Sequence, residues 1–374
     1  MAQHDTVGSD DLGPDDVDLD HFVDVDDFQR AAEARMPEPY RDFVNNVGME
    51  ETLRGDLAAW AELRLRPRAL VDVSHVDTSV TVLGTELSAP IITAPFIGSA
   101  LVDDDAEVAT ARGATAAGTV STLSMMGTRG PEAVGPAAGG RYWQQLYWMR
   151  DRSIVQDVVE RAVAAGASAL CLTVDLPVRP AFPSRMRAAD RAMRGLWEGP
   201  EQAFYVIHDY REKPEEGKRS DTSVTWRDLE WLSGLSELPL ILKGIIRPED
   251  AVLAREHGAS AVIVSNHAGQ GLRFSMPVAH ALPEIVEAVG GEIEVLADSG
   301  IRTGSDVARA LALGARAVLI GRPTLWGLTV GGAAGVERVI RILSDELAEV
   351  MALTGAPRLA DIDGAILAPP RGDR

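Results

Sequence analysis

Eight short apolar runs, each followed by polar or glycine residues and then by a helical stretch, constrain the fold of this 374-residue sequence more than any other feature. In chain order they are PIITAP, GTVSTLS, RYWQQLY, ALCLTVD, LPLILKG, AVIVSNH, EVLADSG and AVLIGRP. Continuous β-branched runs that alternate with helices are typical of parallel strands buried on both faces. Eight such repeats predict an α/β fold, a closed (β/α)8 TIM barrel. The absence of Gly-x-Gly-x-x-Gly after the first run disfavours an open dinucleotide-binding sheet.

Other segments flank or interrupt the barrel pattern. Residues 1–24 are rich in Asp, Gly and Pro and are predicted to form a disordered acidic tail. A helical N-terminal segment follows and contains DDFQRAAEARMP and EETLRGDLAAWAEL. After the fourth strand comes a long insertion, about 178–224, which we expect to be a lid or a subunit contact. We therefore expect one barrel domain over residues 25–362 and a C-terminal tail over 363–374.

The composition excludes several classes of partner. Lys and Arg number 36 against 56 Asp and Glu, a net charge of −20, and only Lys213, Lys218 and Lys243 are lysines. Such a surface repels nucleic acid and anionic membranes, and it suggests adaptation to a salty cytosol rather than an ordinary acidic enzyme. The single cysteine, Cys171, lies in an apolar run, which predicts core packing and excludes a cysteine-based zinc site. No spanning stretch or signal pattern is present, so we expect a cytoplasmic protein.

Polar side chains gather where a TIM barrel places its active site, just past the carboxyl ends of the strands. A purely structural role would put small or apolar residues at most of these positions. The residues there are Ser124, Gln145, Tyr147, Thr173, Asp175, Lys243, Asn266, His267, Asp298, Gly321 and Arg322. Their convergence on one end of the barrel predicts a site.

Two of these residues suggest chemistry. Lys243 lies in the apolar run LPLILKGII, where an unpaired ammonium is costly to bury. We expect it to face an anionic ligand or a group that becomes negative during reaction; a Schiff-base lysine is the competing interpretation. His267 can accept a proton near neutral pH, and Asp175 is a candidate to orient its ring.

The ends of strands seven and eight predict a phosphate site. TIM barrels commonly bind phosphate there through backbone N–H groups and a helix N-terminus. Gly300 and Gly321 allow close approach of the backbone, and Arg302 and Arg322 can pair with phosphate. A phosphate opposite a lysine suggests a phosphorylated cofactor.

The stretches LPLILKGIIRPEDAVLAREHGASAVIVSNHAG and ALPEIVEAVGGEIEVLADSGIRTGSDVARALALGARAVLIGRP resemble the FMN-dependent 2-hydroxy-acid oxidases and dehydrogenases. The resemblance covers about residues 25–362, and SVTWRDLEWL and DSGIRTG are most similar to the lactate 2-monooxygenase branch. It implies an FMN-binding barrel that commonly forms homo-tetramers or octamers. The residues expected to hold FMN are Ser124, Gln145, Thr173, Lys243, Ser265, Asp298, Gly300, Arg302, Gly321 and Arg322.

The same resemblance implies roles for the catalytic residues. Lys243 would stabilise negative charge on the reduced flavin. His267 would take the hydroxyl proton of the substrate while hydride passes to the flavin, with Asp298 supporting the imidazolium. Tyr147 and Asp175 match family positions that line the site.

Several residues depart from the family pattern where it recognises the substrate carboxylate. Gln270 stands in place of the arginine that clamps this carboxylate, Arg273 occupies a normally acidic position, and Phe43 replaces a tyrosine. Losing a bidentate charged pair costs about 2–5 kcal/mol. Ile97 stands where the family has Gly or Ala, which suggests a tighter pocket, and the insertion lacks the family's Gly-x-Arg-x-x-Asp pattern.

Three interpretations follow. The main expectation is oxidation of a lactate-like 2-hydroxy acid, with Arg273 or an arginine of the insertion (Arg179, Arg185 or Arg187) as a new clamp. In the second, the same chemistry acts on a substrate without a free carboxylate, as in the premycofactocin synthase branch, which also lacks the arginine. In the third, FMN is bound without turnover. The acceptor of the electrons stays open between oxygen, a quinone and another protein.

Overall fold

The computed structural model describes residues 17–46, 50–178, 187–189 and 204–368. Its centre is a closed barrel of eight parallel strands in the order β10-β3-β4-β5-β6-β7-β8-β9. The strands are β3 (Ile91–Thr93), β4 (Ser121–Leu123), β5 (Tyr142–Leu146), β6 (Ala167–Thr173), β7 (Leu240–Ile245), β8 (Ala261–Val264), β9 (Glu294–Ala297) and β10 (Ala317–Ile320). Each of the eight apolar runs contains one strand, so the prediction of a (β/α)8 barrel is confirmed.

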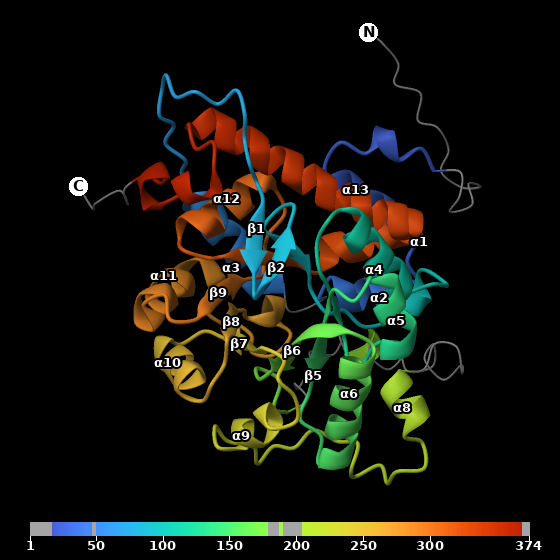
Figure 1. The fold of residues 1–374 in the computed structure, drawn as a ribbon. Coiled ribbons are helices and arrows are strands. Elements are labelled where there is room, and N and C mark those ends of the chain that lie inside the picture. The colour runs from blue at the N-terminus through green and yellow to red at the C-terminus, as the bar shows by residue number, and fades with distance from the viewer. Residues whose placement is uncertain (1–16, 47–49, 179–186, 190–203, 369–374) are drawn as a thin grey trace.

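Helices surround the barrel and connect successive strands (Figure 1). They are α4 (Glu107–Ala116), α5 (Pro131–Ala137), α6 (Arg152–Ala164), α10 (Pro248–Glu256), α11 (Val278–Val289), α12 (Gly304–Ala312) and α13 (Arg322–Thr354). The long α13 is interrupted by non-helical backbone at Gly331 and Gly332. None of the helices in the described ranges is long and apolar enough to cross a membrane.

The N-terminal segment forms three helices, α1 (Val25–Arg35), α2 (Glu38–Val44) and α3 (Glu50–Glu62). Asp24 caps α1: its side chain accepts from the Asp27 backbone N–H, and the Asp27 side chain accepts in return from the cap. Helix α1 packs against α13, and α3 packs against α11 and against the turn η4 (His267–Gly269). The segment therefore reaches the barrel end at which the strands finish.

A hairpin that the sequence analysis missed closes the opposite end of the barrel. Strands β1 (Val80–Val82) and β2 (Thr85–Leu87) pair antiparallel and lie at the centre of Figure 1. Their apolar side chains join the cluster inside the barrel, which also contains Cys171 as predicted. Because the hairpin covers the amino ends of the strands, a ligand has access from the carboxyl ends.

The ends of the chain correct two predicted boundaries. Residues 17–24 are not tail: η2 (Leu19–His21) packs beside α13, and the Phe22 carbonyl accepts from Arg338. At the C-terminus the turn η6 (Gly364–Ile366) buries Ile366, and Arg66 donates its backbone N–H to the Ile366 carbonyl. The apolar side chains anchor both stretches. Residues 1–16 and 369–374 lie outside the described ranges.

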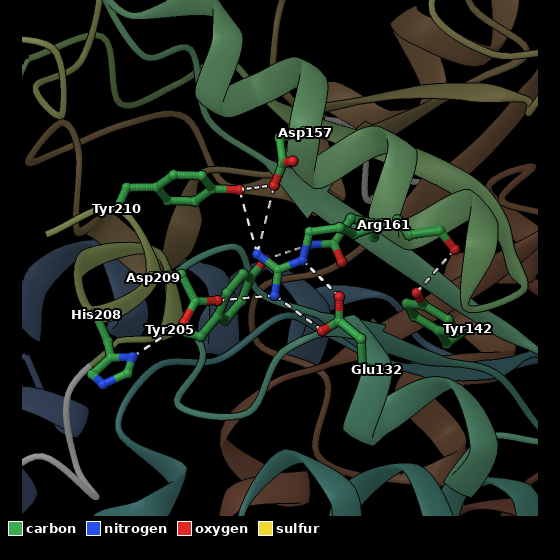
Figure 2. A network of polar contacts seen from close by, with 10 residues as sticks. Glu132, Tyr142, Asp157, Arg161, Tyr205, His208, Asp209 and Tyr210 are labelled. Carbon is green, nitrogen blue, oxygen red and sulfur yellow. Dashed lines mark hydrogen bonds and ion pairs between the residues drawn. The ribbon is translucent and has the colours of Figure 1, made fainter. Parts of the chain in front are cut away.

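The later part of the insertion is anchored to the barrel by Arg161 of α6 (Figure 2). Its guanidinium binds Glu132 of α5 through two bonds of 2.6 and 3.0 Å and Asp209 through one of 2.9 Å. Asp209 belongs to α8 (Tyr205–Asp209), and the Arg161 guanidinium also lies 5.5 Å from the Tyr205 ring centroid. The insertion then continues to α9 (Asp228–Ser233).

Candidate active site at the barrel mouth

A cleft of about 900 Å³ opens at the carboxyl ends of the strands. We call it the barrel-mouth cleft. At one end it is lined by Gly300, Arg302, Gly321 and Arg322, and at the other by Tyr147, His267 and Gln270. Lys243 and Asp298 lie in the wall between. Residues far apart in sequence are thus brought together.

Strand alternation explains why polar side chains reach the cleft. Successive side chains of a strand point to opposite faces, so every second residue faces the barrel interior. Ile241, Ile263 and Leu296 belong to the interior cluster. The inward positions two residues later are Lys243, Ser265 and Asp298, above the apolar interior. The same alternation carries Gln145 and Thr173 inward, two residues after Trp143 and Cys171.

Lys243 forms the centre of a buried polar group. Its Nζ donates to Ser265 Oγ at 2.9 Å and lies 3.0 Å from Asp298 Oδ2. Burial alone lowers the pKa of Lys243, but the carboxylates of Asp298 and Asp175 outweigh burial and hold the pKa above its ordinary value. The ammonium therefore stays protonated. It has no free lone pair, which disfavours the Schiff-base interpretation.

His267 is paired with Asp175. The ring Nδ1 lies 3.1 and 3.2 Å from the two carboxylate oxygens of Asp175. Asp298, to which the resemblance gave this role, instead contacts Lys243 and accepts a bond from Ser299 Oγ at 2.7 Å. Burial raises the pKa of Asp175, but His267 and Lys243 outweigh that effect and keep it below its ordinary value. An ionised Asp175 fixes the ring and leaves Nε2 as the second ring nitrogen for a ligand.

A set of hydrogen bonds fixes the side chains expected beside the flavin. Gln145 Oε1 accepts from Ser124 Oγ at 3.3 Å and from the Met125 backbone N–H at 3.1 Å. Gln145 Nε2 donates to Thr173 Oγ1 at 3.0 Å. Ser124 lines the cleft, whereas Gln145 and Thr173 lie behind it. Tyr147 lines the cleft too, and burial raises the pKa of its phenol, so the hydroxyl stays a donor.

The opposite end has the features of an anion site. Arg302 stacks on Trp326 at 4.4 Å, and Arg322 is buried. Within the described ranges no carboxylate forms an ion pair with either guanidinium. Burial, and then the charge of Arg322, lower the pKa of Arg302, while burial lowers that of Arg322 to about 10. Two buried cations this close require an anion, and the phosphate of a cofactor fits.

Gly300 provides the close backbone approach. Its φ is +91°, and a Cβ at this position would come within 3.0 Å of side-chain atoms of Asp56 and Trp60. The left-handed φ and the lack of room together require glycine. The residues of the barrel-mouth cleft therefore fit FMN, with its phosphate at the arginine end.

The substrate end differs from expectation at one residue. Arg273 pairs with Glu51 at 3.1 Å, is 43% exposed and does not line the cleft. The Glu51 carboxylate neutralises the guanidinium outside the cleft, so Arg273 does not supply the expected clamp. Gln270 and Phe43 do line the cleft, together with Ile97. Arg187 is exposed, and Arg179 and Arg185 lie outside the described ranges.

Comparison with known proteins identifies the family. The profile described as FMN-dependent dehydrogenase matches residues 32–369. The chain belongs to the FMN-dependent dehydrogenase family. FMN is therefore its cofactor, in agreement with the arginine end of the cleft.

Individual relatives cover nearly the whole chain. An L-lactate oxidase from Nostoc sp. is 42% identical over 357 residues, which span 92% of this chain and 98% of that protein. A peroxisomal (S)-2-hydroxyacid oxidase from Arabidopsis thaliana is 38% identical over 92% of this chain and 96% of its own. A mandelate oxidase variant solved with (S)-mandelic acid superposes with a TM-score of 0.83 and 34% identity, covering 94% of this chain and 100% of that one.

The N-terminal helices also contribute residues that the sequence analysis missed. Asn46, Asp56 and Trp60 donate to or accept from the loops after β8 and β9. The sequence carries one signal for Asp56. Thr52, Asp56 and Trp60 are the buried residues at four-residue spacing on α3, so a carboxylate lies on its buried face.

Proposed function

We propose that this protein oxidises the CH–OH group of a 2-hydroxy acid to the corresponding carbonyl, with FMN as the cofactor. The observation that carries the proposal is the His267–Asp175 pair in the barrel-mouth cleft beside the Lys243–Asp298 pair. Family relatives named for lactate and 2-hydroxyacid oxidation support it.

The chain's own residues then have distinct tasks. Bound FMN accepts the hydrogen of the carbinol carbon together with two electrons. His267, oriented through Nδ1 by Asp175, accepts the hydroxyl proton at Nε2. The charged Asp175 stabilises the imidazolium that results. Lys243 holds a positive charge in the cleft wall, where it can stabilise negative charge on the reduced cofactor.

A second candidate substrate class is favoured by the substrate end of the cleft. Gln270 presents a neutral amide there, and the Arg273 guanidinium is bound to Glu51 outside. An amide exchanges hydrogen bonds with a neutral carbonyl group but does not balance a carboxylate charge. The same flavin chemistry would then act on a 2-hydroxy amide, ester or peptide-derived carbinol. A mandelate oxidase variant, 35% identical with a TM-score of 0.80, has been solved with 2-hydroxy-phenylacetamide.

Anaerobic mixing of the FMN-loaded protein with matched acids and amides tests the proposal. The panel contains lactate, glycolate, mandelate and longer 2-hydroxy acids, each with its amide and methyl ester. Bleaching of the oxidised flavin by the free acids supports the main proposal. Bleaching by the neutral partners alone supports the second substrate class. No bleaching by any compound contradicts both and favours FMN binding without turnover.

A further inference from the structure

The loop that carries His267 has a strained backbone. His267 and Ala268 have φ values of +54° and +51°, in the left-handed region that favours glycine. Non-glycine residues held there cost about 1–3 kcal/mol each and persist only where surrounding contacts hold them. The strand register ends at Val264, so β8 itself does not supply those contacts.

The contacts come from the N-terminal helices. Asn46 Nδ2 donates to the Ala268 carbonyl at 2.8 Å. Thr52 Oγ1 accepts from the Phe274 backbone N–H at 2.9 Å. Trp60 Nε1 donates to the carbonyl of Ser299, after β9, at 2.9 Å. Helix α3 and the residues before it therefore bind the loops after both β8 and β9.

Asp56 makes the most concentrated of these contacts. It is fully buried, and its two oxygens accept from Asn266 Nδ2 at 2.8 and 2.9 Å. Its Oδ1 also accepts from the Val278 backbone N–H, at the start of α11, at 3.0 Å. Asn266 directly precedes His267, and its Nδ2 lies 3.2 Å from the Met276 carbonyl. One carboxylate thus fixes both ends of the segment from Asn266 to Val278.

We propose that Asp56 is a positioning residue for the reaction: through Asn266 it holds the strained turn that places His267 against Asp175. The inference rests on the proposed function of His267. Asp56 does not line the barrel-mouth cleft, so its effect on the reaction passes through the loop and not through contact with substrate.

A double-mutant cycle on the FMN-loaded protein tests the proposal. The variants are Asp56→Ala, Asn266→Ala and the double variant, with Glu62→Ala on the exposed face of the same helix as the control. The readouts are FMN content, the thermal midpoint, KM and the anaerobic rate constant of flavin reduction at saturating substrate. Each single variant should slow reduction about tenfold or more, as expected for a displaced catalytic group, with FMN retained. The double variant should be no slower than the slower single variant.

Two outcomes overturn the proposal. One is a lower thermal midpoint with an unchanged rate constant, which is what a merely structural role produces. The other is a double variant whose loss is the product of the two single losses, because Asp56 and Asn266 would then act independently. Should Asp56→Ala fail to fold, Asp56→Asn replaces it in the same cycle.

A second readout separates this proposal from the proposed function. In a crystal structure of Asp56→Asn, His267 Nδ1 should lie farther from Asp175 than the 3.1 Å found here. An unchanged distance contradicts the positioning role. Failure of every panel compound to reduce the wild-type flavin contradicts the proposed function, while this distance still tests the role of Asp56.

Discussion

At the scale of single residues, the carboxylate next to each side chain determines what that side chain can do. Lys243 is held as a cation by Asp298, and His267 is oriented by Asp175. Neither pairing follows from sequence order, because each joins residues from different strands. Alternation along the strands predicts that these side chains point inward, but not which carboxylate meets which base.

Gln270→Arg should shift the preference toward free acids. A guanidinium at the substrate end of the cleft can bind a carboxylate through two bonds, an interaction worth about 2–5 kcal/mol. We expect the ratio of kcat/KM for a 2-hydroxy acid to kcat/KM for its amide to rise about 30-fold or more. Steady-state kinetics on one acid–amide pair measures it, with Gln270→Met as the uncharged control. An unchanged ratio would show that residue 270 does not contact this part of the substrate.

Asp56 should make stability depend on pH. Burial raises the pKa of its carboxyl from 3.8 to about 7; bonds from Asn266 and Val278 oppose this, as does Arg322, while Asp298 adds to it. Ionisation is therefore harder in the folded state than in the unfolded state, and the contribution of Asp56 to stability falls as pH rises from about 4 to about 7. The full displacement corresponds to about 4 kcal/mol.

The variant Asp56→Asn removes this titration. Relative to the wild type, its unfolding free energy should increase between pH 4 and pH 8 and level off above. Parallel thermal or urea unfolding series at several pH values measure the difference. A difference that is constant with pH would contradict the raised pKa.

At the scale of elements, the insertion depends on one arginine for its attachment to the barrel. Arg161→Leu removes the ion pairs with Glu132 and Asp209 and leaves Tyr205 without its cationic partner (Figure 2). Because the guanidinium is only 22% exposed and binds several groups, we expect a loss of about 1–3 kcal/mol and a thermal midpoint lower by a few degrees. Arg211→Leu, whose arginine is 65% exposed, is the control and should change little. Equal midpoints for the two variants would contradict the anchoring role.

The elements also show how far the sequence predicts this fold. All eight barrel strands were identified, because long apolar runs alternate with helices in a regular way. The β1–β2 hairpin was missed because three-residue strands are too short to establish a period. Arg273 was placed in the cleft because its neighbours in sequence are there, but its partner Glu51 lies on α3, 222 residues away. Asp56 was missed for the same reason, since Asn266 is 210 residues distant.

At the scale of the whole molecule, we propose that the net charge of −20 is an adaptation to high salt. Repulsion among surface carboxylates destabilises the folded chain, and salt shortens its range from about 10 Å at 0.1 M to about 3 Å at 1 M. The thermal midpoint should therefore rise steadily between 0.1 and 2 M KCl. Sorbitol at equal osmolality is the control and should have a smaller effect. A midpoint that is flat or falls with KCl would contradict the adaptation.

The central claim is that His267 accepts the substrate proton beside a bound FMN. The most direct measurement is the anaerobic rate of flavin reduction in His267→Ala, with the exposed His280→Ala as the control. The account predicts a His267→Ala protein that keeps its yellow cofactor, while reduction by the best panel substrate is slower by about 10²–10⁴-fold. His280→Ala should match the wild type. Reduction of His267→Ala at the wild-type rate would contradict the account.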